Sequence, residues 1–413
     1  MVINDSRAVS AVREGILNAV SCGCDEFRWR RLVTRRHLLK GGAGLAALGL
    51  HLPAARFAAL AQEATPAGAR DGLALIQGQH PSPVINGSFV SPLVEIFGEV
   101  EIGQRSFIAG NTLLYAAEGV RISLGNENNC QDNAYLLARQ RNLAFGDMVS
   151  IAHQAVIENS VVGDFTFFGF RSRTRNSEIG EGAMIMHNTT VENVVIPPNR
   201  ITPLGVRITT QTEADALPEV TEANDEFKHE VQEVNIALVE GYIALFEQVG
   251  RDGVEGIGPN PVTNFNPVSA SPQFGDGVSL AELVRITGDV RLGEGSTVGQ
   301  RSSIRADEGA PIVIGRRARI LSRVTFHALK GTSVEVGDNA RIGDGNVIHG
   351  PVSIGDNFVA EDDCVVFQAM VENNVTVRTG ATVAGNFVLR EGTIVPESAV
   401  VTNQDEADAL PIR

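Results

Sequence analysis

The chain has few aromatic side chains and little cysteine. Aromatic residues make up 5% of its 413 residues, whereas glycine occurs 43 times, so its core must be built from small aliphatic side chains joined by tight turns. None of the four cysteines has zinc-ribbon spacing, and we expect Cys130 and Cys364 to be buried free thiols. The formal charge of −15 makes nucleic acid and anionic membrane surfaces poor partners. The composition therefore favours a β-rich globular protein.

Positive charge is concentrated in the first 61 residues. The pair Arg35-Arg36 precedes a glycine-rich apolar run, and small residues follow at Ala59 and Ala61. This order is typical of a twin-arginine signal peptide with an A-x-A cleavage site. We expect residues 1–61 to be removed after export, which leaves a periplasmic or other extracytoplasmic protein that starts near Gln62. A basic amphipathic leader or an uncleaved anchor is the alternative, although the apolar run is too short to span a membrane comfortably, and the mature chain contains no expected span.

Aliphatic residues recur at every sixth position along most of the remaining chain. A period of six fits neither a helix nor simple strand alternation, but it fits a solenoid in which three hexapeptides make one triangular coil. Residues about eighteen apart then lie above one another at a strand spacing of about 4.8 Å. The first run consists of Val84, Val90, Ile96, Ile102, Ile108, Leu114 and Val120, and a second begins with Val268, Phe274, Leu280 and Ile286.

The two halves of the chain repeat each other. The segment 98–103 matches 288–293, and Glu-Ala-Asp-Ala-Leu-Pro occurs at both 213–218 and 406–411. We therefore predict an all-β fold with two tandem parallel β-helix domains of hexapeptide repeats. The expected boundaries are residues 80–222 for the first domain, 223–249 for a helix that packs outside it, 250–267 for a linker and 268–413 for the second domain.

Histidines are the best candidates for chemistry, because a catalytic zinc needs three protein ligands and one open position. Six follow the signal: His80, His153, His187, His229, His327 and His349. No H-E-x-x-H motif is present, so the ligands must come from separate coils or domains. We expect His80, His187 and His229 to be surface or turn residues.

Four segments resemble the γ-class carbonic anhydrases: Val149–Gln154, Arg305–Ile312, Phe326–Leu329 and Ile348–Pro351. The resemblance covers nearly everything after residue 80. It implies left-handed β-helices, trimer-like packing of the domains, and a zinc ion at each contact between domains. In that family two histidines come from one side of the contact and a third from its neighbour.

Neither half carries all three histidines. His327 and His349 match the pair from one side, but Asp344 stands where the second half would need the third ligand. The first half has that ligand as His153, whereas Leu137 and Glu158 replace the other two. The halves thus complement each other.

Further family positions are divided in the same way. The second half keeps Arg305 and Asp307, which match an ion pair across the contact, and Glu308, which matches a proton-handling residue. The first half keeps Gln131, which the resemblance assigns to orienting the activated water, followed by Asp132.

Two arrangements remain open. A mixed contact between a first and a second domain would assemble His153, His327 and His349. Three identical chains around a threefold axis would instead stack like domains, leaving His327, His349 and Asp344, a set that still binds zinc or iron.

The function that follows from the resemblance is the reversible hydration of carbon dioxide to bicarbonate. Zn²⁺ is the expected cofactor, with Fe²⁺ or Co²⁺ as alternatives, and self-association of β-helix domains is expected. Two other functions stay open: a non-catalytic scaffold or binding protein, and a hexapeptide acyltransferase. Export disfavours the acyltransferase, because acyl-coenzyme A is absent outside the cytoplasm.

Overall fold

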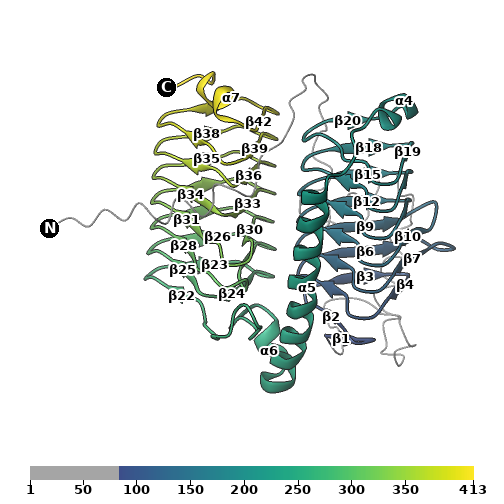
Figure 1. Cartoon of the computed structure of the whole chain (residues 1–413). Helices are drawn as coiled ribbons and strands as arrows, with labels where there is room; N and C mark the ends of the chain where they lie inside the picture. The colour runs from purple at the N-terminus through teal and green to yellow at the C-terminus, as the bar shows by residue number, and fades with distance from the viewer. Residues whose placement is uncertain (1–82) are drawn as a thin grey trace.

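A computed structural model describes residues 83–413, so the predicted signal peptide lies outside the described residues. Two solenoids stand side by side and ascend in the same direction (Figure 1). Each is built from three sheets in which neighbouring strands belong to successive coils and pair in parallel, apart from the antiparallel pair β1–β2. The predicted pair of tandem parallel β-helix domains is confirmed, and we call them the first and second domain.

The sheets that position the site are one from each domain. In the first domain this sheet contains β1 (Val84–Ile85), β2 (Ser88–Val90), β5 (Phe107–Ile108), β8 (Asn129–Cys130), β11 (Ser150–Ile151), β14 (Phe167–Phe168) and β17 (Met184–Ile185). In the second domain it contains β21 (Ile257–Gly258), β24 (Arg285–Gly288), β27 (Ser303–Ala306), β30 (Thr325–Ala328), β33 (Val347–Gly350), β36 (Val365–Phe367), β39 (Thr382–Ala384) and β42 (Val400–Val401).

The other sheets complete the triangles. Those of the first domain are β4 (Glu99–Ile102), β7 (Arg121–Leu124), β10 (Leu143–Phe145), β13 (Val161–Val162), β16 (Glu178–Ile179) and β19 (Val195–Ile196), and then β3 (Glu95–Phe97), β6 (Leu113–Ala116), β9 (Tyr135–Ala138), β12 (Val156–Glu158), β15 (Arg173–Arg175), β18 (Thr190–Glu192) and β20 (Arg207–Ile208). Those of the second domain are β22 (Gln273–Phe274), β25 (Val290–Leu292), β28 (Ile312–Ile314), β31 (Val334–Val336), β34 (Val352–Ile354), β37 (Met370–Val371) and β40 (Val388–Leu389), and then β23 (Ser279–Leu280), β26 (Thr297–Val298), β29 (Arg319–Ile320), β32 (Arg341–Ile342), β35 (Val359–Ala360), β38 (Thr376–Val377) and β41 (Ile394–Val395).

The six-residue period arises, as predicted, from aliphatic residues that fill the interior of the solenoids. Aliphatic residues of the repeat, such as Ile108, Leu114, Ile304 and Ile348, point into the solenoids and are fully buried. Each coil turns its corners through residues in the left-handed backbone region, and many of these are asparagines, which tolerate that conformation. Cys130 and Cys364 are buried free thiols, as expected.

The helix after the first domain is α5 (Glu222–Val249). Its N-terminus is closed by a capping box in which the Thr221 side chain accepts from the backbone N–H of Asn224 and the Asn224 side chain accepts from Thr221. At 28 residues it is about 42 Å long, so it carries the chain back along the first domain and the second domain starts at the same end (Figure 1). This return explains why the two solenoids run in the same direction.

Short helices occur at three other places in the described part of the chain, residues 83–413. The Glu-Ala-Asp-Ala-Leu-Pro repeats form the ends of α4 (Gln211–Asp215) and α7 (Gln404–Asp408) and the turns after them. The expected linker contains α6 (Arg251–Val254) and β21, which pairs with β24, so the second domain's sheet begins earlier than predicted. Within residues 83–413, no helix is both long and apolar enough to cross a membrane.

Polar corner residues of the first domain bind the corner of the second. Gln154 donates from Nε2 to the carbonyl oxygen of Arg323 at 2.8 Å, and Asn188 donates to the Thr382 hydroxyl at 2.6 Å. Arg171 donates to the carbonyl oxygen of Gly345 and forms an ion pair with Asp363 at 2.9 Å.

Apolar side chains close the same contact. One cluster combines four residues of the first domain with two of the second: Ala152, Phe167, Phe170, Met184, Val347 and Val365. The two halves of one chain therefore share an interface.

Candidate metal centre

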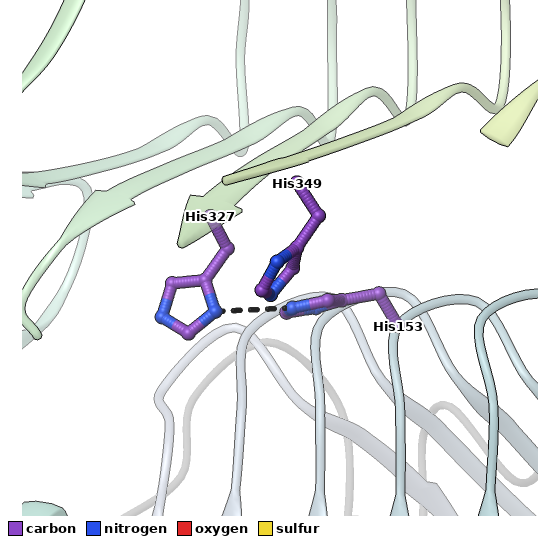
Figure 2. A group of neighbouring side chains, drawn as sticks. All are labelled: His153, His327 and His349. Carbon is purple, nitrogen blue, oxygen red and sulfur yellow. Dashed lines mark hydrogen bonds between the residues drawn. The ribbon is translucent and has the colours of Figure 1, made fainter. Parts of the chain in front are cut away.

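Three histidines meet where the two domains touch (Figure 2). His327 on β30 and His349 on β33 are register partners in neighbouring coils, so their side chains leave the same face of the second domain one above the other. His153 lies in the turn after β11 of the first domain. All three are buried, and one ligand nitrogen from each lies within 4.8 Å of the other two.

The distance between two of these rings suits a metal. Nε2 of His153 lies 3.2 Å from Nδ1 of His327. Two nitrogens bound at 2.0–2.1 Å to a tetrahedral zinc are about 3.3 Å apart. The separation therefore matches a shared ion.

The surroundings of His327 and His153 favour tautomers that also suit a shared metal ion. On its far side His327 places Nε2 3.1 Å from Asp307 Oδ1, and His153 places Nδ1 3.3 Å from Asp132 Oδ2. The second contact is too poorly aligned to count as a hydrogen bond, but both carboxylates attract an N–H. Each ring then turns a lone pair toward the other, an arrangement that a cation between them stabilises.

The third ring, that of His349, also keeps a nitrogen lone pair for a metal. Nδ1 of His349 donates to the carbonyl oxygen of Gly350 at 2.9 Å, which leaves Nε2 with a lone pair. Burial lowers the pKa of His349 well below its usual value and that of His153 to about 4. Both rings are therefore neutral near pH 7, which is the form that binds zinc. The donor set fits a three-histidine zinc site.

Arg305 joins the carboxylates behind the rings. Its Nε donates to Asp132 Oδ2 at 2.8 Å, its Nη1 to Asp307 Oδ2, and its Nη2 to Gln131 Oε1 at 2.6 Å. Burial alone would raise the carboxyl pKa values, but the Arg305 charge holds the pKa of Asp132 and of Asp307 well below the usual range. Asp132 also accepts from the Ser303 hydroxyl at 2.6 Å. The ion pair of Arg305 with Asp307 was expected across the contact, but it forms within the second domain. Across the contact, Arg305 binds Asp132 and Gln131 of the first domain.

Glu308 faces the same nitrogen of His327 as Asp307 does. Its Oε1 is 3.3 Å from Nε2 of that ring, and burial raises the pKa of Glu308 to about 7. A carboxyl group with this pKa exchanges a proton readily at neutral pH. The position is therefore suited to proton transfer.

Aromatic rings pack against the His349 side of the site. Phe170 lies 4.7 Å from His349 and 4.4 Å from His187, ring centre to ring centre, and Phe367 lies 5.4 Å from His349. His187 lies in a turn, one of the two positions expected for it, but it is buried beside Phe170, and burial lowers its pKa to about 4. His229 is exposed, and His80 lies outside the described residues.

Asp344 is not part of the cluster. It is exposed in a turn of the second domain, and its Oδ1 accepts from the backbone N–H of Ser322 at 2.9 Å. Glu158 of the first domain is also elsewhere, 3.5 Å from the Arg139 guanidinium. The structure thus brings together the mixed set of histidines within one chain.

Helix α5 supplies two side chains that sequence reasoning missed. Asn235 accepts from Gln131 Nε2 at 2.7 Å, and the Tyr242 hydroxyl donates to Asp307 Oδ2 at 2.6 Å. A signal was present in the sequence, because Lys228, Gln232, Asn235 and Tyr242 recur at helical spacing on one face. Polar residues on the buried face of a helix indicate polar partners beneath it.

Comparison with known proteins supports the resemblance. A carboxysome assembly protein, CcmM, from Nostoc sp. is 34% identical over 168 residues, which cover 38% of this chain and 30% of that protein. A carbonic anhydrase from Methanosarcina thermophila is 29% identical over 184 residues, which cover 40% of this chain and 74% of that enzyme. No protein-family model matches the chain.

Among solved structures, a putative acetyltransferase from Bacillus cereus is similar, with 24% identity and a TM-score of 0.36, over 39% of this chain and 91% of that one. The match to CcmM spans less than a third of that relative's length. The sequence similarities and the parallel β-helices support placing the chain in the hexapeptide-repeat superfamily that includes the γ-class carbonic anhydrases.

Proposed function

We propose that the chain is a zinc-dependent carbonic anhydrase that converts carbon dioxide to bicarbonate at the contact between its two domains. The observation that carries the proposal is the convergence of His153, His327 and His349, each with a lone pair free for a metal. Similarity to the Methanosarcina carbonic anhydrase supports the substrate.

Zinc bound by three imidazoles lowers the pKa of a water molecule to about 7 and so supplies a nucleophile for carbon dioxide at neutral pH. The protein's own residues do the rest. Asp307 and the Gly350 carbonyl orient the rings of His327 and His349, and Phe170 and Phe367 pack against the His349 ring and shield it from bulk water.

Glu308 is placed to receive the proton that the reaction releases, because its carboxyl group borders His327 and has a pKa of about 7. Gln131 has a supporting role, since its amide oxygen accepts from Arg305 and its amide nitrogen donates to Asn235. It stabilises the position of Arg305.

Zinc content and the carbon dioxide hydration rate of the purified protein test this proposal, with His153→Ala and Asp344→Ala as a matched pair. We expect His153→Ala to lose both zinc and activity and Asp344→Ala to keep both. Loss in Asp344→Ala alone would instead favour contacts between like domains of different chains.

A non-catalytic scaffold is the second candidate. Similarity to a carboxysome assembly protein favours it, as does the replacement of metal-ligand positions by Leu137, Glu158 and Asp344. A wild-type protein that binds no zinc and does not hydrate carbon dioxide would leave this function in place of catalysis.

We also propose export by the twin-arginine route and further self-association of β-helix domains. Replacing Arg35 and Arg36 by lysine should retain the protein in the cytoplasm, as cell fractionation would measure. Light scattering of the exported protein gives its mass, and a monomer would contradict self-association.

A further inference from the structure

Tyr242 connects helix α5 to the metal centre without touching a histidine ligand. Its side chain is 2% exposed, and its ring packs against Phe89 and Phe107 of the first domain, with centres 4.7 and 5.6 Å away. The ring is thus fixed by one domain, while the hydroxyl reaches Asp307 of the other domain at 2.6 Å.

The hydrogen bond from Tyr242 leaves the two oxygens of the Asp307 carboxylate with different partners. Oδ2 accepts from Tyr242 and from Arg305, and Oδ1 faces Nε2 of His327 at 3.1 Å. Two donors at one oxygen hold the plane of the carboxylate, so the other oxygen stays aimed at the ring. The His327 N–H is then drawn to Nε2, and Nδ1 keeps the lone pair that faces His153.

We propose that Tyr242 is a positioning residue for the zinc site, acting through Asp307 on the orientation and tautomer of His327. The inference rests on the proposed metal site and deepens it. Helix α5 is then part of the metal centre as well as the connection between the domains.

Asn235 shows that this contact is not isolated. It lies seven residues before Tyr242 on the same face of α5, and it accepts from Gln131, whose oxygen binds Arg305. The helix therefore reaches the polar network at two points. The linker adds a third, since Asn266 Nδ2 donates to the backbone oxygen of Asp307 at 3.2 Å.

Zinc affinity of the full chain tests the inference, measured by competition with a chromophoric chelator. Tyr242→Phe keeps the packed ring and removes only the hydroxyl, and we expect it to weaken zinc binding about 10- to 100-fold, the usual effect of losing an outer-shell partner. Tyr135→Phe is the matched control, because Tyr135 is a half-buried tyrosine of the first domain whose ring packs against Arg323. Its affinity should equal that of the wild type.

A double-mutant cycle separates positioning from general stability. If Tyr242 acts through Asp307, then Tyr242→Phe/Asp307→Asn should bind zinc no more weakly than Asp307→Asn alone. Additive losses, or an unchanged affinity and cobalt absorption spectrum in Tyr242→Phe, would overturn the inference.

The two proposals fail differently. Zinc bound by the wild type and lost in His153→Ala supports the metal site whatever Tyr242 does. A wild type that binds no zinc refutes both. Should Tyr242→Phe not fold, Tyr242→Met replaces the ring by an adaptable apolar side chain without a donor, and the same drop in zinc affinity is required of it.

Discussion

Arg305 is a buried charge at the contact between the domains. Its side chain is 2% exposed, and it pairs with Asp132 of the first domain and Asp307 of the second, which are both fully buried. Replacing it by leucine leaves two buried carboxylates without their counter-charge. Breaking a buried ion pair from one side costs about 3–5 kcal/mol. We therefore expect Arg305→Leu to lower the free energy of unfolding by about that amount.

Urea unfolding followed by far-ultraviolet circular dichroism, at neutral pH and with a chelator present, measures this loss without any contribution from bound metal. Arg316→Leu is the matched control, because Arg316 pairs with Asp338 in the same domain but at the exposed surface. Solvent screens that pair, so its removal should change the stability little. Equal effects of the two substitutions would refute the reasoning.

Neutralising a carboxylate should relieve part of the loss. In the variant Arg305→Leu/Asp132→Asn one of the two uncompensated charges is gone, so the double substitution should cost less than the sum of the single ones. Strict additivity would show that Arg305 and Asp132 do not interact as the 2.8 Å hydrogen bond between them requires.

Three further predictions concern proton transfer, the core and the corner. Glu308→Gln should retain zinc but slow carbon dioxide hydration by about 10²- to 10⁴-fold, the range for loss of a general acid or base. Metal analysis would measure the zinc content and stopped-flow assays the hydration rate. An unchanged rate would exclude the proton-transfer role. Phe326→Ala should cost about 3–5 kcal/mol in urea unfolding, because Phe326 is fully buried inside the second domain; a loss below about 1 kcal/mol would contradict this. Gly345→Ala should lower the midpoint temperature of thermal unfolding, because Gly345 has a φ of +66° and a β-carbon there would lie 2.6 Å from Asp363 Oδ1. An unchanged midpoint would show that the turn at Gly345 adjusts freely.

Much of the architecture was predictable because it is local and repetitive. An aliphatic residue every six positions can be buried only if the chain turns at the same interval, and residues such as Ile108 and Ile304 occupy the interior for that reason. The duplicated segments predicted two such domains. The start of the second domain was less clear, because β21 is two residues long and lies in a stretch rich in glycine, proline and asparagine.

The ligands were less predictable than the fold. The residue types identified His327 and His349, whose spacing puts them in adjacent coils, but His153 and Asp344 remained rival third ligands. Pairing within a coil follows from the repeat, whereas contact between domains depends on the direction in which the connecting helix returns the chain. The role of Tyr242 could not be predicted either, because its partner Asp307 lies 65 positions away in another domain.

The sequence by itself determined the period of the coils, the duplication and the complementary losses of ligand positions, because each of these is a pattern along the chain. Only the tertiary structure decided that the two halves meet within one chain and that His153, rather than Asp344, joins the other two histidines. The physical reason is that α5 spans the length of the first domain, and so starts the second domain beside the first with a matching polar corner against it.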